Sequence, residues 1–219
     1  HSVKVNNEEI STGKMIIATG SESILLPVPG LDLPGVLTTD DILELPKLPE
    51  SLVVIGGSHV SVEFACIFNA LGTKVTIVKR RPLQLEPVDE EIGRRFAQTL
   101  PRRGIEIKTG AAVKAIKQNG ATLRVVWDTS DGEHGVNGQV VLMATGRQPY
   151  TEGLGLSELA ISLSGRAIEV NDRLETSVKD VYAIGDVLGK SMLAHVASAE
   201  GEVAVENALG HSRRMDYSA

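Results

Sequence analysis

The chain has 219 residues and a mass of 23.3 kDa, which is enough to bury a sizeable core in one or two domains. Its net charge of −6 and its aromatic content of 3% argue against a nucleic-acid or anionic-membrane partner, and no apolar run approaches the roughly 20 residues of a membrane span. The single cysteine excludes a disulfide or a two-cysteine redox pair within these residues, and with no visible signal peptide we expect a cytoplasmic setting.

The first fifty residues predict short strands followed by an extended linker. Strand-like segments at residues 3–5 and 14–18 flank a polar turn. Five prolines fall in residues 23–50 and favour a linker with one short helix near residues 39–45, for which Thr39 is the expected N-cap.

The most informative segment begins at Ser51. It predicts a buried strand at residues 52–55, a glycine turn, a helix, and a second buried strand at residues 74–78. This order is the first half of a dinucleotide-binding βαβ unit, in which backbone N–H groups and a helix N-terminus can hold a pyrophosphate. A second helix is expected at residues 89–103, with Ile92, Phe96 and Leu100 on one face, followed by a third parallel strand at residues 105–108.

The periodicity then changes from helical to strand-like. Three strand-like runs are joined by Asn119-Gly120, a strong hairpin signal, and by residues 128–138. The runs are residues 112–117, 121–127 and 139–144. They predict a three-stranded antiparallel insertion that returns to a buried strand at residues 140–144. Beyond it we expect loops, a buried strand at residues 181–184, one helix at residues 191–209, and a polar tail without an element of its own.

The glycine turn, Gly56-Gly57-Ser58-His59-Val60-Ser61, departs from the full G-x-G-x-x-G fingerprint at its second and third glycines. Ser61 is tolerable, because that position needs only a small residue for helix packing. Ser58 stands where the backbone approaches the pyrophosphate, so either its hydroxyl hydrogen-bonds a phosphate or its Cβ holds the ligand off.

The second strand ends in Lys79-Arg80-Arg81, where an acid usually accepts the ribose 2′-OH of NAD. Cations there favour the 2′-phosphate of NADP. The alternative is a solvated basic turn.

Four isolated residues invite a structural and a functional interpretation. Cys66 is expected to pack in the core, and His195 to be structural. Glu63 is either a first-turn acid favoured by the helix dipole or a functional carboxylate. Asp186 follows a buried strand, where ligands bind in α/β sheets, and it suits a sugar or ribityl hydroxyl.

Four motifs in register resemble those of the class I pyridine nucleotide–disulfide oxidoreductases, most closely the dihydrolipoamide dehydrogenases among them. The motifs are Ile16-Ile-Ala-Thr-Gly-Ser21, the turn from Gly56 to Glu63, Ala144-Thr-Gly-Arg-Gln-Pro149, and Thr176-Ser-Val-Lys-Asp-Val-Tyr-Ala-Ile-Gly-Asp186.

The resemblance implies an α/β fold: a Rossmann-like three-layer parallel sheet with a three-stranded antiparallel insertion, flanked by an incomplete second unit like an FAD domain. Residues 1–47 would be an FAD-domain-like segment and linker, residues 48–148 the NAD(P) domain, residues 149–210 a second FAD-domain-like segment, and residues 211–219 a tail. Members of the family pass a hydride between nicotinamide and FAD and then electrons to or from a dithiol.

The turn, the basic run and the resemblance together select candidate cofactor-binding residues. Those for NAD(P) are Gly56, Gly57, Ser58, His59, Glu63, Lys79, Arg80, Val113, Ala144, Thr145, Gly146 and Arg147, with Glu63 near the nicotinamide. Those for FAD are Gly20, Asp186 and Ala194. No metal site is expected.

The sequence also departs from the family. Its flavin-phosphate glycine motif, its C-x4-C disulfide and its C-terminal dimerisation domain are not found in these residues, and Lys79 stands where the dehydrogenases usually have Glu. We therefore expect a central fragment that binds a nicotinamide nucleotide, contains no catalytic residue, does not retain FAD and is inactive alone, from a parent that is a homodimer. The alternative is a non-catalytic nucleotide-binding module.

Overall fold

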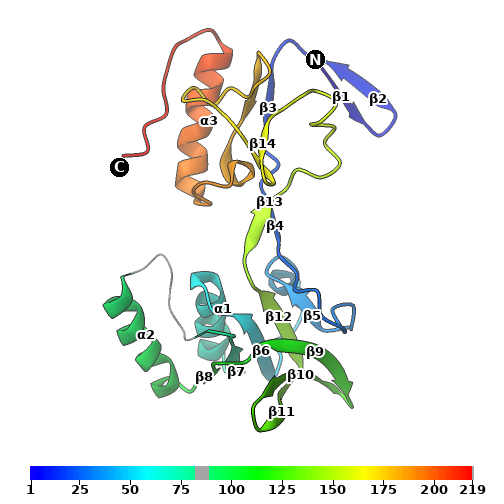
Figure 1. Ribbon diagram of the computed structural model, residues 1–219, viewed down its shortest axis with the longest axis vertical. Coiled ribbons are helices and arrows are strands. Elements are labelled where there is room, and N and C mark those ends of the chain that lie inside the picture. Colours follow the sequence, from blue (N-terminus) through cyan, green and yellow to red (C-terminus); the bar gives the residue numbers. More distant parts are fainter. Residues whose placement is uncertain (82–88, 219) are drawn as a thin grey trace. The chain divides into compact units, whose positions relative to one another are not determined.

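The computed structural model describes residues 1–81 and 89–218. The chain forms two compact units: residues 23–146 make one, and residues 1–22 with 147–219 make the other (Figure 1). Residues 23–47, which the sequence groups with the flanking segment, thus share a unit with the βαβ segment that begins at Ser51. The reason is that β5 (Val36–Thr38) joins its sheet.

The unit of residues 23–146 is built on a five-stranded parallel sheet with the order β5-β12-β6-β7-β8. The other strands are β12 (Val140–Ala144), β6 (Ser51–Gly56), β7 (Lys74–Val78) and β8 (Glu106–Lys108). The Val/Ile/Leu-rich runs of β6, β7 and β12 fit central parallel strands, which are covered on both faces. The expected Rossmann-like sheet is confirmed.

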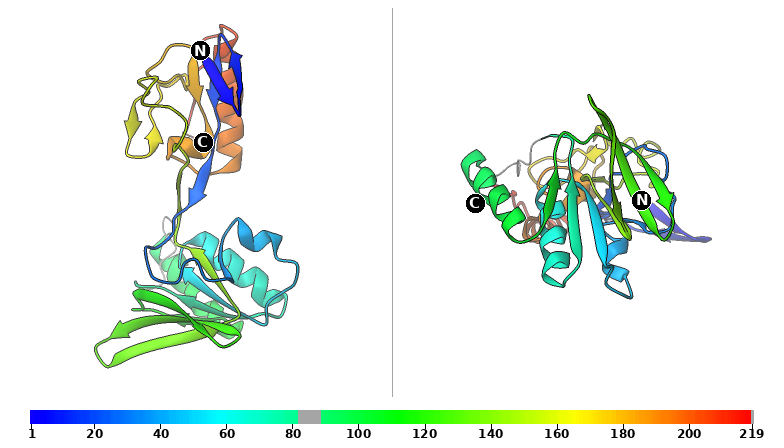
Figure 2. Two further views of the ribbon diagram at one scale, coloured as in Figure 1. Left: turned by 90° about the vertical axis from the view of Figure 1, so that its right-hand side faces the viewer. Right: turned by 90° about the horizontal axis from the view of Figure 1, so that it is seen from below.

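Helices cover one face of this sheet and an antiparallel sheet covers the other (Figure 2). Leu52 and Val54 pack with Phe68 of α1 (His59–Ala70), in a core that also holds Leu100 of α2 (Glu90–Arg102). Val53 and Ile55, which alternate with them, pack against the antiparallel strands β9 (Val113–Asn119), β10 (Thr122–Thr129) and β11 (Gly132–Gly138). This alternation produces the three layers.

Two details of this unit differ from the sequence prediction. The third insertion strand is β11, not residues 139–144; β12 lies between β5 and β6 in the parallel sheet. Gly132 and Gly135 weakened the strand pattern in β11, although pairing with β10 compensates. The exposed fraction of Ile92 is 60%, so it does not belong to the buried face of α2.

The predicted short helix is a 3₁₀ turn, η1 (Asp41–Glu44). Thr39 does not cap it: the Asp41 carboxylate instead accepts the Thr38 backbone N–H at 2.9 Å and the Thr38 hydroxyl at 2.7 Å. These two hydrogen bonds hold the pKa of Asp41 below its ordinary value.

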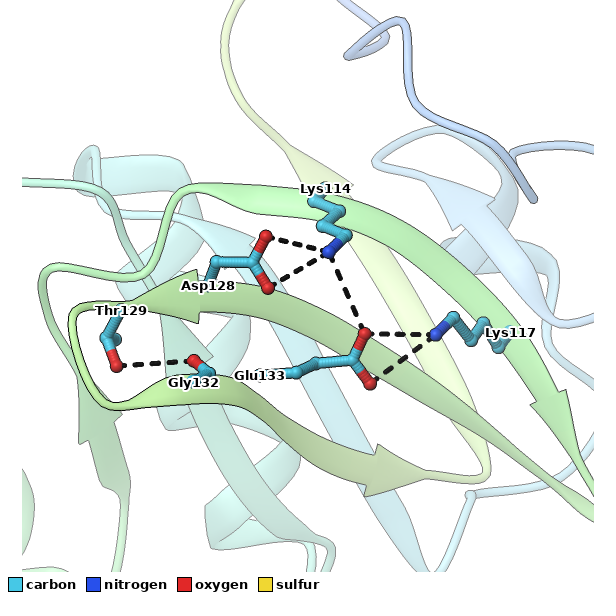
Figure 3. A network of polar contacts seen from close by, with 6 residues as sticks. All are labelled: Lys114, Lys117, Asp128, Thr129, Gly132 and Glu133. Carbon is cyan, nitrogen blue, oxygen red and sulfur yellow. Dashed lines mark hydrogen bonds and ion pairs between the residues drawn. The ribbon is translucent and has the colours of Figure 1, made fainter.

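The outer face of the antiparallel sheet carries an ion-pair network (Figure 3). Lys114 Nζ lies 2.7 Å from Asp128 Oδ2, and Lys117 Nζ lies 3.2 Å from Glu133 Oε2. Lys114 also approaches Glu133 at 3.9 Å. These side chains are about half exposed, and exposed pairs stabilise a fold by only about 0–1 kcal/mol each. The charges make this a solvated face.

The other unit is assembled from both ends of the chain. Its strands β3 (Met15–Ile17) and β16 (Val181–Ala183) form a two-stranded parallel sheet. The hairpin of β1 (Ser2–Val5) and β2 (Glu8–Ser11) was only half predicted, because the polar β2 lacks an apolar signal. The remaining elements are β4 (Ser21–Ser23), β13 (Arg147–Pro149), β14 (Leu163–Ser164), β15 (Ala167–Ile168), the 3₁₀ turn η2 (Gly185–Leu188) and α3 (Ala194–Ala208). α3 begins three residues later than expected, because Leu193 is extended.

A buried carboxyl group ties the polar tail to this unit. Glu200 of α3 is 1% exposed; its Oε2 accepts the Gly185 N–H at 2.6 Å, and its Oε1 accepts the Tyr217 hydroxyl at 2.7 Å. Asn207 holds the same tail through both the N–H and the carbonyl of Arg213. The tail therefore lies fixed along α3 although it forms no helix or strand.

Tyr217 should give this unit an alkaline limit to its stability. Burial and the hydrogen bond to Glu200 raise the pKa of its hydroxyl above the ordinary value near 10. A raised pKa stabilises the fold below the unfolded pKa, and the stabilisation is lost as pH rises beyond it. We expect the urea concentration at half-unfolding to decrease as the pH rises above 10. In Tyr217→Phe this decrease with pH should be less steep. Burial also raises the pKa of Tyr182, which accounts for a slope that remains. An unchanged slope in Tyr217→Phe would contradict the prediction.

Candidate functional site

A cavity of about 590 Å³ lies within residues 23–146, where β6, β7 and β12 end. The carboxyl ends of parallel strands meet at one edge of a sheet, which is where ligands bind in open α/β folds. The cavity is lined by Leu26, Ile55, Gly56, Gly57, Ser58, Val78, Lys79, Arg80, Arg81, Ala111, Ala112, Val113, Ala144 and Thr145.

The glycine turn fits closely against the end of β12. Gly56 has φ +144°, and a Cβ built on it would lie 2.2 Å from the carbonyl oxygen of Ala144. Ser61 is fully buried, and its hydroxyl donates to the same oxygen at 2.9 Å. A glycine is therefore required at position 56, whereas the serine at the fingerprint's third position is accommodated by a hydrogen bond.

The N-terminus of α1 supplies hydrogen-bond donors beside this turn. Ser58 is the N-cap, and the first intrahelical bond runs from the Val62 N–H to the Ser58 carbonyl. The preceding N–H groups of the first turn have no intrahelical acceptor, and the Ser58 side chain does not cap them. Such a terminus, with its positive dipole end, suits a phosphate.

The described part of the cavity lining is positively charged. Among the described lining residues the charged side chains are Lys79, Arg80 and Arg81, and none is acidic. Arg80 and Arg81 are exposed, whereas Lys79 folds back and donates from Nζ to the carbonyl of Gly57 at 3.1 Å. The basic run therefore contains a lysine bound to the turn and two arginines at the surface.

Most of the predicted NAD(P) residues line this cavity. They are Gly56, Gly57, Ser58, Lys79, Arg80, Val113, Ala144 and Thr145. Four others lie outside the lining. His59 and Glu63 are exposed on α1. Gly146 accepts the Ile24 N–H, and Arg147 hydrogen-bonds to Ser21 in the other unit.

Five of the described lining positions were not among the candidates from the sequence: Leu26, Ile55, Val78, Ala111 and Ala112. Ile55 and Val78 belong to the ends of β6 and β7. The two alanines follow β8. The rule that ligands bind at the carboxyl ends of parallel strands was applied to β6 and β7, and its application to β8 would have found them. Leu26 lies in the proline-rich segment and carries no comparable signal.

The three residues predicted to face FAD lie in the other unit. Asp186 Oδ2 accepts the Ser21 hydroxyl at 2.6 Å, and Arg147 Nε donates to that hydroxyl oxygen at 2.8 Å. Gly20 has φ +71°, and a Cβ there would meet nothing within 4 Å. Ala194 is exposed as the first residue of α3. The fold thus brings Asp186 beside the Gly20–Ser21 turn.

In the part of the chain that the structure describes, the other reactive side chains do not gather at one place. Cys66 packs against the helical core as predicted, and His195 is exposed. Within residues 1–81 and 89–218, no three His, Cys, Asp or Glu side chains are grouped as metal ligands. No helix in the same residues is both long and apolar enough to cross a membrane.

Comparisons with known proteins agree with this architecture. Residues 1–201 match the family described as pyridine nucleotide-disulphide oxidoreductase. The dihydrolipoyl dehydrogenase of Acholeplasma laidlawii is 39% identical over 99% of the chain, which covers 64% of that protein. That of Pseudomonas aeruginosa is 36% identical over 95% of the chain, which covers 44% of it. The HOCl-induced flavoprotein disulfide reductase RclA of Escherichia coli superposes with a TM-score of 0.90 at 31% identity over 98% of the chain, which covers 49% of that structure.

Proposed function

Since the chain belongs to the pyridine nucleotide-disulphide oxidoreductase family, we propose that its unit of residues 23–146 binds the nicotinamide nucleotide of a dihydrolipoyl dehydrogenase-like flavoprotein. The observation that carries this proposal is the convergence of the glycine turn, the N-terminus of α1 and three cations on one cavity. The pyrophosphate would lie at the N–H groups that follow Ser58. The ribose of the adenosine would then lie toward Arg80 at the end of β7.

The whole protein would couple this nucleotide to a flavin and a dithiol. When bound, the nicotinamide would supply or accept a hydride, and the flavin would provide the redox centre between it and the dithiol. In this chain Asp186 and the Gly20–Ser21 turn fit a flavin's hydroxyl-bearing chain, because a carboxylate offers acceptors and the space above Gly20 is open. Two contacts remain predictions from the resemblance: Ala194 would contact FAD, and Glu63 would lie near the nicotinamide.

A polypeptide of these 219 residues should purify colourless and show no disulfide reductase turnover. Its one thiol, Cys66, cannot form a dithiol, and a few hydrogen bonds from Asp186 and Gly20 seldom offset the cost of association. The measurements are a visible spectrum and a steady-state assay with added FAD and either nucleotide. Stoichiometric flavin, or turnover that survives Cys66→Ala, would contradict this. A non-catalytic nucleotide-binding module is the second candidate function, favoured by that single thiol.

We further propose that the cavity prefers NADP to NAD. One or two charge-assisted bonds to a 2′-phosphate contribute about 1.5–3 kcal/mol, which corresponds to about ten- to a hundredfold in affinity. Ser58 cannot create this preference, because both nucleotides contain the pyrophosphate. Calorimetric titration of NADPH and NADH at low salt should show tighter NADPH binding. The triple replacement of Lys79, Arg80 and Arg81 by Gln should abolish the advantage. Equal affinities in the unmodified chain would identify the run as a solvated turn.

A further inference from the structure

Lys79 occupies the space that a side chain at Gly57 would fill. A Cβ built on Gly57 would lie 2.1 Å from Lys79 Cδ and 2.9 Å from Nζ. The ammonium donates to the Gly57 carbonyl at 3.1 Å, so the lysine stem lies flat across the turn with its head bonded to it. The glycine at position 57 is therefore explained by the lysine, because its φ is not in the left-handed region.

The backbone of Lys79 is fixed as well. Its N–H donates to the Lys108 carbonyl at 2.8 Å, and its own carbonyl accepts the Ala111 N–H at 3.1 Å. Main chain and side chain together connect the segment after β7 with the segment after β8 and with the glycine turn. These three segments carry most of the cavity lining.

We propose that Lys79 is a positioning residue that clamps the glycine turn, and that Arg80 and Arg81 distinguish a 2′-phosphate from a 2′-hydroxyl. This inference rests on the proposed function and divides the basic run into two roles. If Lys79 turned toward a 2′-phosphate, it would lose its hydrogen bond to the Gly57 carbonyl, and its stem would no longer pack over the glycine turn. The exposed guanidinium groups have no such cost, and their planar donor fork matches a phosphate.

The two roles predict different changes in nucleotide affinity. Lys79→Met keeps an unbranched stem over Gly57 and removes only the ammonium, so the turn loosens where every nucleotide places its pyrophosphate. We expect NADPH and NADH to weaken by the same factor and their ratio to stay constant. Arg80→Met and Arg81→Met, singly and together, should weaken NADPH about tenfold or more while NADH remains unchanged. Adenosine 2′,5′-bisphosphate contains the 2′-phosphate but lacks the pyrophosphate linkage. Its affinity should therefore decrease in the arginine variants and change less in Lys79→Met.

Gly57→Ala provides an independent test of the clamp. Its Cβ must displace the lysine stem, so it should weaken both nucleotides as Lys79→Met does. The double variant Gly57→Ala/Lys79→Met should then lose less than the sum of the two single losses, because both remove one interaction. Thermal unfolding of each variant shows whether it has folded.

The outcomes separate this inference from the NADP proposal. If the unmodified chain shows no NADPH advantage, the NADP proposal fails. The role of Lys79 is still tested, because Lys79→Met and Gly57→Ala should weaken both nucleotides equally and their double variant should be non-additive. If Lys79→Met selectively removes the NADPH advantage, Lys79 contacts the 2′-phosphate and the inference is overturned. Additive losses in the double variant would overturn it too.

Discussion

Gly56→Ala is expected to abolish nucleotide binding and to lower the free energy of unfolding of the 23–146 unit by about 2–5 kcal/mol. Two effects combine. Alanine is strained at φ +144°, and its Cβ would lie 2.2 Å from the Ala144 carbonyl oxygen, a backbone atom at the carboxyl end of β12. Relief of this clash must separate β6 from β12, which moves the turn and its N–H groups together. Denaturant unfolding and NADPH titration measure the two losses.

Gly72→Ala is the matched control. Gly72 also has a positive φ, +95°, but a Cβ there would meet nothing within 4 Å. Gly72→Ala should therefore lower the free energy of unfolding only by the cost of the backbone conformation, about 1–3 kcal/mol. It should leave nucleotide binding intact. If Gly56→Ala costs no more than Gly72→Ala and still binds NADPH, the close approach of the turn to β12 is not required.

Glu200→Ala is the second substitution with a large expected effect, about 3 kcal/mol in the free energy of unfolding of the other unit. It removes the acceptor for the Gly185 N–H and for the Tyr217 hydroxyl. It also leaves a space where a buried side chain stood. We expect the tail to detach from α3 and the Gly185–Asp186 turn to loosen, which hydrogen exchange at Gly185 would detect.

Glu202→Ala, on the same helix, is the control. The Glu202 side chain is 71% exposed and lies 3.8 Å from Arg213, so its loss should cost less than about 0.5 kcal/mol. Glu200→Gln should fall between the two, since its amide oxygen can still accept the Gly185 N–H. Similar unfolding free energies for Glu200→Ala and Glu202→Ala would show that the buried carboxyl group does not hold the tail.

The parallel sheet was predictable because its strands are apolar runs bounded by turn signals. β6 and β7 matched almost residue by residue, and Asn119-Gly120 marked the β9–β10 hairpin. β11 and β2 were not predictable to the same degree. Their polar residues and glycines contain no alternating pattern, and pairing with a neighbouring strand decides their conformation.

The candidate site was predictable where the chemistry is local. Gly56, Ser58 and the basic run follow from the βαβ order alone, and the cavity brings them together. The fold of Lys79 onto Gly57 was not predictable, because sequence places a cation at a strand end without showing which acceptor it meets. Arg147 illustrates the same limit: its motif is adjacent to Ala144, yet its guanidinium bonds to Ser21, far away in the sequence.

Where the chain enters and leaves the 23–146 unit, its two segments lie side by side. The Ile24 N–H donates to the Gly146 carbonyl at 2.9 Å, and the Thr145 hydroxyl donates to the Ile24 carbonyl at 2.6 Å. A module whose ends meet can be transplanted as one piece or closed on itself by a short linker. A gene segment for residues 23–146 should therefore yield a domain that folds without residues 1–22 and 147–219.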